Sequence, residues 1–234
     1  MLLSVDQLTK NYGATLAVDQ VSFAISKGEV VGFLGPNGAG KSTTMKMIVG
    51  FLQADKGRVT LNGVSHQEDA VAYKKMIGYL PESNALYEDM YLKEYLSFIA
   101  DGHQIENSNN RIKEVIEQTG LGLMQSKKIS QLSKGYKQRV GIAGAIMHQP
   151  ILLLLDEPTA GLDPNQLIEI RTLIKSLSAQ SMVLLSTHIL QEVTAICDRV
   201  LVLHQGKLVA DAPMATLLEK YQASLEEIFK MLTH

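Results

Sequence analysis

Residues 35–43 read GPNGAGKST, and this glycine-rich stretch constrains the fold more than any other part of the sequence. It fits the pattern G-x-x-x-x-G-K-[ST]. It lies between an apolar run, EVVGFLG at 29–35, and a stretch with helical periodicity at 41–51. A loop with few side chains exposes its backbone N–H groups, and the start of a helix adds positive potential. The order of strand, loop and helix therefore predicts a site for the phosphate groups of a nucleotide, rather than a flexible glycine turn.

The end of the loop carries the side chains that such a site needs. Lys41 supplies a mobile positive charge for the outer phosphates, and Ser42 supplies a hydroxyl ligand for Mg²⁺. The residues predicted to contact the nucleotide here are Gly35, Pro36, Asn37, Gly38, Ala39, Gly40, Lys41, Ser42 and Thr43.

Polar side chains follow two further apolar runs. In ILLLLDEP, residues 151–158, Asp156 is placed to hold Mg²⁺ and Glu157 to orient and deprotonate an attacking water. The alternative is that the two acids cap the next helix. His188 follows MVLLS at 182–186, and a polar residue at the carboxyl end of a strand faces the ligand crevice of an open α/β sheet.

The distribution of apolar residues predicts an α/β fold in one domain. Short runs typical of strands fall at 21–25, 29–35, 58–63, 77–81, 151–155 and 182–186, and a hairpin at 199–210 turns at Gln205–Gly206. Residues from 83 to about 150 have helical patterns instead, with a surface loop at 102–110, and 223–233 reads as a final helix. We therefore predict an α/β core, 1–82 and 151–234, interrupted by a helical subdomain at about 83–150.

Composition excludes several classes of protein. The net charge of −2 and the pI of about 6.3 do not indicate a nucleic-acid binder. The single cysteine, Cys197, excludes an internal disulfide, suits a reducing compartment and is expected to be buried. The N-terminus is not that of a signal peptide, and no apolar run approaches the roughly 18 residues of a membrane span. We therefore expect a soluble, cytoplasmic chain whose membrane role would require a partner.

Together, these motifs resemble those of the ATP-binding subunits of ABC transporters, in order and over nearly the whole chain. Tyr12 in LTKNYG resembles the aromatic residue that stacks on adenine, and GPNGAGKST resembles the Walker A loop. The remaining matches are IGYLPE (77–82, leading to the Q-loop), LSKGYKQR (132–139, the signature), ILLLLDEP (Walker B), AGLDP (160–164, the D-loop) and STH (186–188, the switch histidine).

The resemblance implies a P-loop NTPase core with a mainly parallel sheet, an N-terminal antiparallel β region and an inserted helical subdomain. It also implies an ATP-dependent dimer, here a homodimer, in which each Mg²⁺-ATP lies between the Walker A loop of one chain and the signature of the other. Ser133 and Gly135 would contact the γ-phosphate across the interface, and Asp163 would couple the two sites. Glu157 would be the general base, with His188 positioning phosphate and water. The chain would be held at the inner face of the cell membrane by transmembrane permease subunits.

Two departures from the family pattern affect the site. Lys134 and Tyr136 replace a glycine and a glutamine of the usual LSGGQ signature. Glu82 stands where the Q-loop usually has glutamine, and its carboxylate is a suitable ligand for a hard metal ion. These substitutions resemble those of subunits that serve exporters of drugs, polysaccharides or lipids, and of gliding-motility transporters.

A different class of function stays open at this point. Some soluble ABC ATPases act mechanically on ribosomes or DNA, but those chains fuse two ATPase units or insert coiled coils or zinc sites. This sequence has one unit, no heptad run and one cysteine. The sequence therefore favours a transporter subunit, with the soluble class as the alternative.

Overall fold

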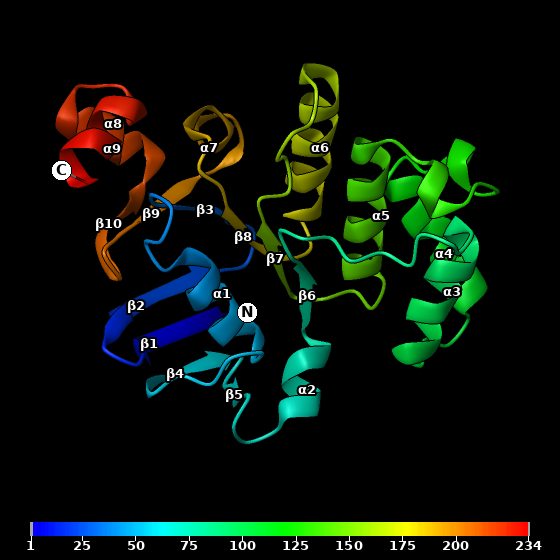
Figure 1. Ribbon diagram of the computed structural model, residues 1–234, viewed down its shortest axis with the longest axis horizontal. Helices are drawn as coiled ribbons and strands as arrows, with labels where there is room; N and C mark the ends of the chain where they lie inside the picture. Colours follow the sequence, from blue (N-terminus) through cyan, green and yellow to red (C-terminus); the bar gives the residue numbers. More distant parts are fainter. Residues whose placement is uncertain (1, 234) are drawn as a thin grey trace.

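The structure is a computed structural model that describes residues 2–233, and it contains two β-sheets with helices around the larger one (Figure 1). The antiparallel sheet has the strand order β2-β1-β4-β5, formed by β1 (Leu2–Tyr12), β2 (Thr15–Ser26), β4 (Lys56–Leu61) and β5 (Val64–Ser65). The larger sheet has the order β10-β9-β3-β8-β7-β6, formed by β3 (Val30–Leu34), β6 (Ile77–Leu80), β7 (Leu152–Asp156), β8 (Met182–Ser186), β9 (Arg199–His204) and β10 (Lys207–Pro213). Only the β9–β10 pair of this sheet is antiparallel.

Helices connect and cover these strands. In chain order they are α1 (Lys41–Val49), α2 (Ala70–Lys75), α3 (Leu92–Gly102), α4 (Ser108–Gln118), α5 (Lys134–Ile146), α6 (Pro164–Leu177), α7 (Leu190–Ile196), α8 (Met214–Tyr221) and α9 (Leu225–Thr233). Two short 3₁₀ turns lie at Gly122–Met124 and Ile129–Gln131. None of the helices within 2–233 combines the length and the apolar character needed to cross a bilayer.

Strand β3 lies in the middle of the larger sheet, between β8 and β9, and all of its residues are buried. Val31 and Phe33 pack toward α1 and the antiparallel sheet, whereas Val30 and Leu34 pack into a second cluster with the helical region. A strand covered on both faces reads as an uninterrupted apolar run. This position brings the loop after β3 to the same edge of the sheet as the carboxyl ends of β7 and β8.

The helices α3, α4 and α5 form a group beside the sheet, joined to it through the neighbouring parallel strands β6 and β7 (Figure 1). Arg111 on α4 donates to the carbonyl oxygens of Ile146 and Met147, at 2.7 and 2.9 Å, and so ties α4 to the end of α5. The predicted α/β class is confirmed, with its mainly parallel sheet, its N-terminal antiparallel region and its inserted helices.

Two details of the prediction were wrong. The surface loop predicted at 102–110 is shorter, because α4 begins at Ser108 and α3 extends to Gly102. The polar residues Ser108 and Asn109 are the first turn of an amphipathic helix, so their polarity did not mark a loop. The strand predicted at 21–25 extends over Thr15–Ser26, where it forms a long hairpin with β1.

Candidate functional site

The glycine-rich loop connects β3 to α1, and close packing explains two of its glycines. A Cβ atom on Gly40 would lie 2.4 Å from the carbonyl oxygen of Ala17, and Gly40 has a left-handed backbone with φ of 104°. A Cβ atom on Gly35 would lie 2.4 Å from the carbonyl oxygen of Leu203. The backbones of strands β2 and β9 therefore pack closely against the loop, and a residue with a side chain at Gly35 or Gly40 would displace it.

Helix α1 begins without a side-chain cap, so its first N–H groups face the loop. Lys41 is buried, and its Nζ donates to the carbonyl oxygens of Gly35 and Pro36 at 2.7 and 3.2 Å. Burial lowers the pKa of Lys41, and the nearby carboxylates of Glu157, Asp156 and Glu82 act in the opposite direction. A positive charge and free backbone donors thus meet at one place, which suits a polyphosphate.

Asp156 ends strand β7 and pairs in register with Ser186 at the end of β8. It is buried, its Oδ1 has no hydrogen-bond partner within residues 2–233, and burial raises its pKa against the effect of the Ser186 and Ser42 hydroxyls. No group of three or more His, Cys, Asp or Glu side chains in the described chain could hold a metal ion by itself. The Ser42 hydroxyl with the Asp156 and Glu82 carboxylates is an all-oxygen set, however, and it fits Mg²⁺, which keeps several waters.

Glu157, the next residue, faces His188 across the ends of β7 and β8. The His188 Nδ1 donates to Glu157 Oε1 at 2.8 Å, since a carboxylate can only accept. The second oxygen, Glu157 Oε2, is buried and has no hydrogen-bond partner in the described part of the chain. The imidazole is about half exposed, so the pair has a fixed carboxylate on one side and an accessible ring on the other.

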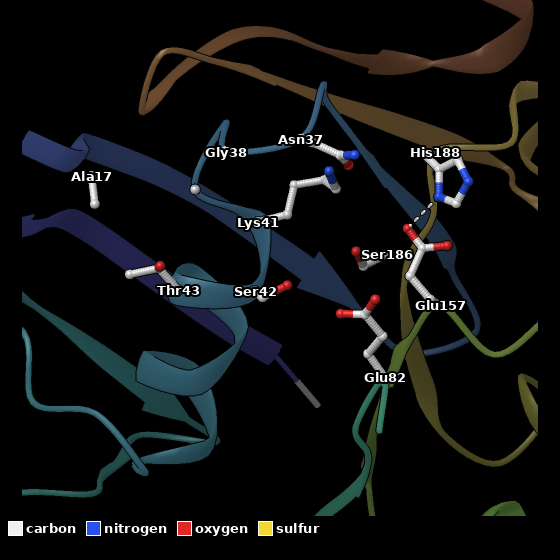
Figure 2. A pocket seen from close by; sticks show the side chains of 11 residues that line it. Ala17, Asn37, Gly38, Lys41, Ser42, Thr43, Glu82, Glu157, Ser186 and His188 are labelled. Carbon is white, nitrogen blue, oxygen red and sulfur yellow. Dashed lines mark hydrogen bonds and ion pairs between the residues drawn. The ribbon is translucent and has the colours of Figure 1, made fainter. Parts of the chain in front are cut away.

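A cavity of about 430 Å³ brings these elements together, within the size range of small-molecule sites (Figure 2). The phosphate loop and the start of α1 line one side, and Glu157 with His188 lies opposite. The predicted residues that line it are Asn37, Gly38, Gly40, Lys41, Ser42, Thr43, Glu82, Glu157 and His188. Gly35, Pro36 and Ala39 belong to the loop but do not line the cavity, and the buried Asp156 does not line it either.

Glu82 reaches this cavity from the segment after β6, and its carboxylate faces Ser42 (Figure 2). If it contributes to a Mg²⁺ site, Glu82→Gln should raise the Mg²⁺ concentration for half-maximal ATP hydrolysis about fivefold, equivalent to about 1 kcal/mol of lost charge attraction in wet surroundings. Titration of Mg²⁺ at saturating ATP measures this. Asp89→Asn removes the same charge outside the cavity and should leave the titration unchanged. Identical curves for Glu82→Gln and wild type would place Glu82 outside the metal's reach.

The four remaining predicted site residues do not line the cavity either. Tyr12 is exposed at the end of β1, and Ser133 and Gly135 lie at the start of α5. Ser133 caps α5 by accepting from the Tyr136 N–H at 3.4 Å. Asp163 caps α6 by accepting from the N–H groups of Asn165 and Gln166. Because Asp163 caps this helix, the alternative that Asp156 and Glu157 cap it is wrong.

Two lining residues were not predicted, Ala17 from β2 and Ser186 from β8. Ala17 carries no chemistry of its own, and only the path of β2 over the phosphate loop brings it there. Ser186 had a signal in the sequence, because it directly precedes Thr187 and His188 at the end of an apolar strand.

Comparisons with known proteins agree with the fold and the site described above. The sequence profile of the ABC transporter family matches residues 18–160. The bacitracin transport ATP-binding protein BcrA of Bacillus licheniformis is 36% identical over 96% of this chain and 74% of its own length. The linearmycin resistance ATP-binding protein LnrL of Bacillus subtilis is 37% identical over 89% of this chain and 68% of its own. A solved structure described as an ATP-binding subunit of an ABC transporter superposes over the full length of both chains, with a TM-score of 0.90 and 32% identity.

Proposed function

Because the chain belongs to the ABC transporter family of ATP-binding, ATP-hydrolysing proteins, we propose that it drives a separate transmembrane permease by hydrolysing ATP in the cavity beside Lys41. The observation that carries this proposal is the meeting of the phosphate loop and the Glu157–His188 pair across one cavity. The names of the two relatives support a subunit of an exporter of antimicrobial compounds or similar molecules.

The predicted site residues are proposed to divide the work as follows. Lys41 and the N–H groups of the loop hold the phosphates, and the Glu157 carboxylate, which lines the opposite side of the cavity, takes a proton from the attacking water. His188 holds Glu157 through Nδ1 and offers its other ring nitrogen to the γ-phosphate. Tyr12, exposed at the end of β1, stacks on the adenine. Ser42, Asp156 and Glu82 would hold Mg²⁺, and the bound ion would supply positive charge to the phosphates.

A complete site requires a second copy of the chain. Ser133 is exposed, and both it and Gly135 lie outside the cavity of their own chain. In the proposed head-to-tail dimer they contact the γ-phosphate held by the partner, and Asp163 lies at the same interface. The positive charge of Lys134 adds to this surface: a Cβ atom on Gly161 would lie 2.3 Å from its Nζ, so the signature and the D-loop of one chain are in contact.

The permease is proposed to dock on a groove of about 260 Å³ between the end of β6 and helices α3 and α5. The imidazoles of His103 and His148 stack along it with centroids 4.0 Å apart, and burial lowers the pKa of His148 to about 4, so His148 is uncharged at neutral pH. Tyr87 and Phe98 are exposed beside the groove, in edge-to-face contact at 5.4 Å. This uncharged, aromatic surface suits an apolar segment of a membrane protein and would hold the chain at the inner face of the membrane.

Affinity purification from detergent-solubilised membranes tests the partner. A protein with several membrane spans is expected to co-purify, and Phe98→Glu should reduce its recovery about tenfold or more by placing a charge in a buried apolar contact. Met231→Glu changes another exposed apolar residue, on α9, and should leave recovery unchanged. Purification of ribosomes or nucleic acid in place of a membrane protein would favour the soluble alternative, against which the net charge of −2 argues.

A further inference from the structure

A buried carboxylate that does not line the cavity lies outside the set of residues discussed so far. Glu192, on α7, has no solvent exposure, and its Oε2 accepts hydrogen bonds from two hydroxyl groups. The donors are Thr159 Oγ1, in a short bond, and Thr187 Oγ1, at 3.1 Å. Both threonines are as buried as Glu192, so water does not compete for these bonds.

The two threonines belong to the two segments that carry the catalytic pair. Thr159 comes two residues after Glu157, and Thr187 directly precedes His188. These segments follow neighbouring strands, β7 and β8, and nothing in their covalent connection holds their tips together. One oxygen atom of Glu192 therefore ties the segment of the carboxylate to the segment of the histidine, on the side away from the cavity.

The backbone at Glu157 explains why such a tie is needed. Its φ of 51° is left-handed, an unfavourable conformation for a residue with a side chain, and one that persists only where the surroundings hold it. The Glu157 N–H donates to Ser186 O at 2.9 Å, and Glu157 O accepts from the Ala160 N–H at 3.2 Å. Thr159 lies between Glu157 and the rest of the loop. The hydrogen bond to Glu192 fixes Thr159, and this prevents the loop from relaxing to a right-handed or extended backbone at Glu157.

We propose that Glu192 is a positioning residue for ATP hydrolysis, which keeps Glu157 and His188 at hydrogen-bonding distance by bridging Thr159 and Thr187. The inference rests on the proposed function, since it presumes that the Glu157–His188 pair acts on ATP. Glu192 does not touch the cavity, so it acts on the orientation of the carboxylate and leaves the phosphate loop as it is.

The bridge depends on the acceptor geometry rather than on the charge. Both hydroxyls donate to the same oxygen, and the other, Oε1, is buried with no hydrogen-bond partner among the described residues. The amide of glutamine has one acceptor oxygen and can accept both bonds. Methionine has a similar length and no comparable acceptor. Glu192→Gln should therefore keep the bridge, and Glu192→Met should lose it.

Steady-state ATPase assays and equilibrium ATP binding make the test. Glu192→Met should lower kcat about 10- to 100-fold, the size expected when a catalytic group is misplaced by about 1 Å. Its ATP dissociation constant should stay within about twofold of wild type, because Lys41 and its loop are unchanged. Glu192→Gln should retain kcat within about threefold. Thr159→Val removes one of the two hydrogen bonds to Glu192 and leaves Glu192 unchanged. Its kcat should fall between those of Glu192→Met and Glu192→Gln.

A purely structural role predicts a different pattern. Glu192→Met leaves the Thr159 hydroxyl buried without an acceptor, which destabilises the fold, and adding Thr159→Val removes that unpaired group. The Thr187 hydroxyl also loses its acceptor, but it still accepts from the Ile189 N–H at 3.1 Å and is left as threonine in both variants. The double variant should therefore regain part of the lost thermal stability while kcat stays low. Recovery of kcat together with stability would overturn the proposal.

Further outcomes decide between the inference and its premise. Equal losses of kcat in Glu192→Gln and Glu192→Met would show that the charge matters and would overturn the bridge. If Glu192→Met does not fold, the test depends on Glu192→Gln and Thr159→Val alone. A wild-type kcat in Thr159→Val would then reject the proposed bridge. Failure of the proposed function would appear earlier and separately, as a wild-type chain that does not bind or hydrolyse ATP.

Discussion

Lys41→Ala is expected to weaken ATP binding by about 10- to 100-fold and to abolish nearly all hydrolysis, while the protein stays folded. The ammonium is the only side-chain cation among the residues that line the cavity, and a hydrogen bond to a charged group contributes about 1.5–3 kcal/mol. Calorimetric titration with ATP measures the affinity. Lys46→Ala removes the same charge from the exposed face of α1 and should bind ATP normally.

The stability of this variant follows from the sign of the pKa shift. Burial lowers the pKa of Lys41 below its usual value near 10.5, so the folded state holds that proton less tightly than the unfolded state. The charged lysine therefore costs stability at neutral pH, and the cost disappears only as the pH rises to about 10.5. Alanine removes this cost but also removes the Lys41 donor from the Gly35 carbonyl, while the Pro36 carbonyl still accepts from the Ala39 N–H at 3.1 Å, so the melting temperature should change little. Normal ATP affinity in a folded Lys41→Ala would reject the phosphate-loop assignment.

The second large effect concerns the site shared between two chains. Glu157→Gln keeps the shape of the side chain but removes the base, so hydrolysis should fall about 10²- to 10⁴-fold while ATP still binds. The variant should accumulate as an ATP-bound dimer, visible by size-exclusion chromatography or light scattering, because hydrolysis no longer opens it. Ser133→Arg places a bulky cation at the exposed start of α5 and should hinder closure.

Mixing the two single variants tests the arrangement directly. In a mixed dimer, one site collects both defects. The other site combines an intact Glu157 from the Ser133→Arg chain with an intact Ser133 from the Glu157→Gln chain. Random pairing at a 1:1 ratio makes about half of the dimers mixed, and one of the two sites in each mixed dimer is intact. Mixing should therefore restore up to about a quarter of wild-type ATPase activity if that site turns over independently. As a control, a chain carrying both substitutions, mixed with wild type, gives mixed dimers in which each site has one defect.

These mixtures are informative only if each single variant is inactive alone and mixed dimers are shown to form, for example by pull-down through a tag on one chain. With those conditions met, a failure to recover ATPase activity at any mixing ratio would argue against a shared site that turns over while the second site of the dimer is inactive. A wild-type chain that stays monomeric yet hydrolyses ATP at full rate, independently of its concentration, would reject the dimer mechanism.

The local elements of this fold could be predicted because their causes are local. The buried strands β7 and β8 are continuous apolar runs, and the β9–β10 hairpin turns at Gln205–Gly206 as expected. The start of α4 was missed because Asn107, the residue before the helix, has a left-handed conformation and makes no side-chain cap, so the usual signal is absent. The short helix α7 was not predicted, since seven residues carry too little periodicity.

The residues of the candidate site also include some that the sequence could predict and some that it could not. The residues of the phosphate loop, Asp156, Glu157 and His188 could be predicted because each follows a recognisable apolar strand. Ala17 could not, because its place depends on how β2 crosses the loop. The contact of Glu192 with Thr159 joins residues 33 positions apart through side chains alone, and no pattern in one sequence specifies such a contact.

The position of β3 in the larger sheet has a consequence for biosynthesis. Both of its neighbours, β8 and β9, are made long after this strand, and β9 finishes only at His204. At the usual rate of translation, roughly 10–35 s pass between the synthesis of β3 and that of β9. During that interval the apolar residues of β3 have no sheet to join, and the phosphate loop lacks the backbone of Leu203 against which Gly35 packs. Nucleotide therefore cannot stabilise the phosphate loop of the growing chain until β9 has been made.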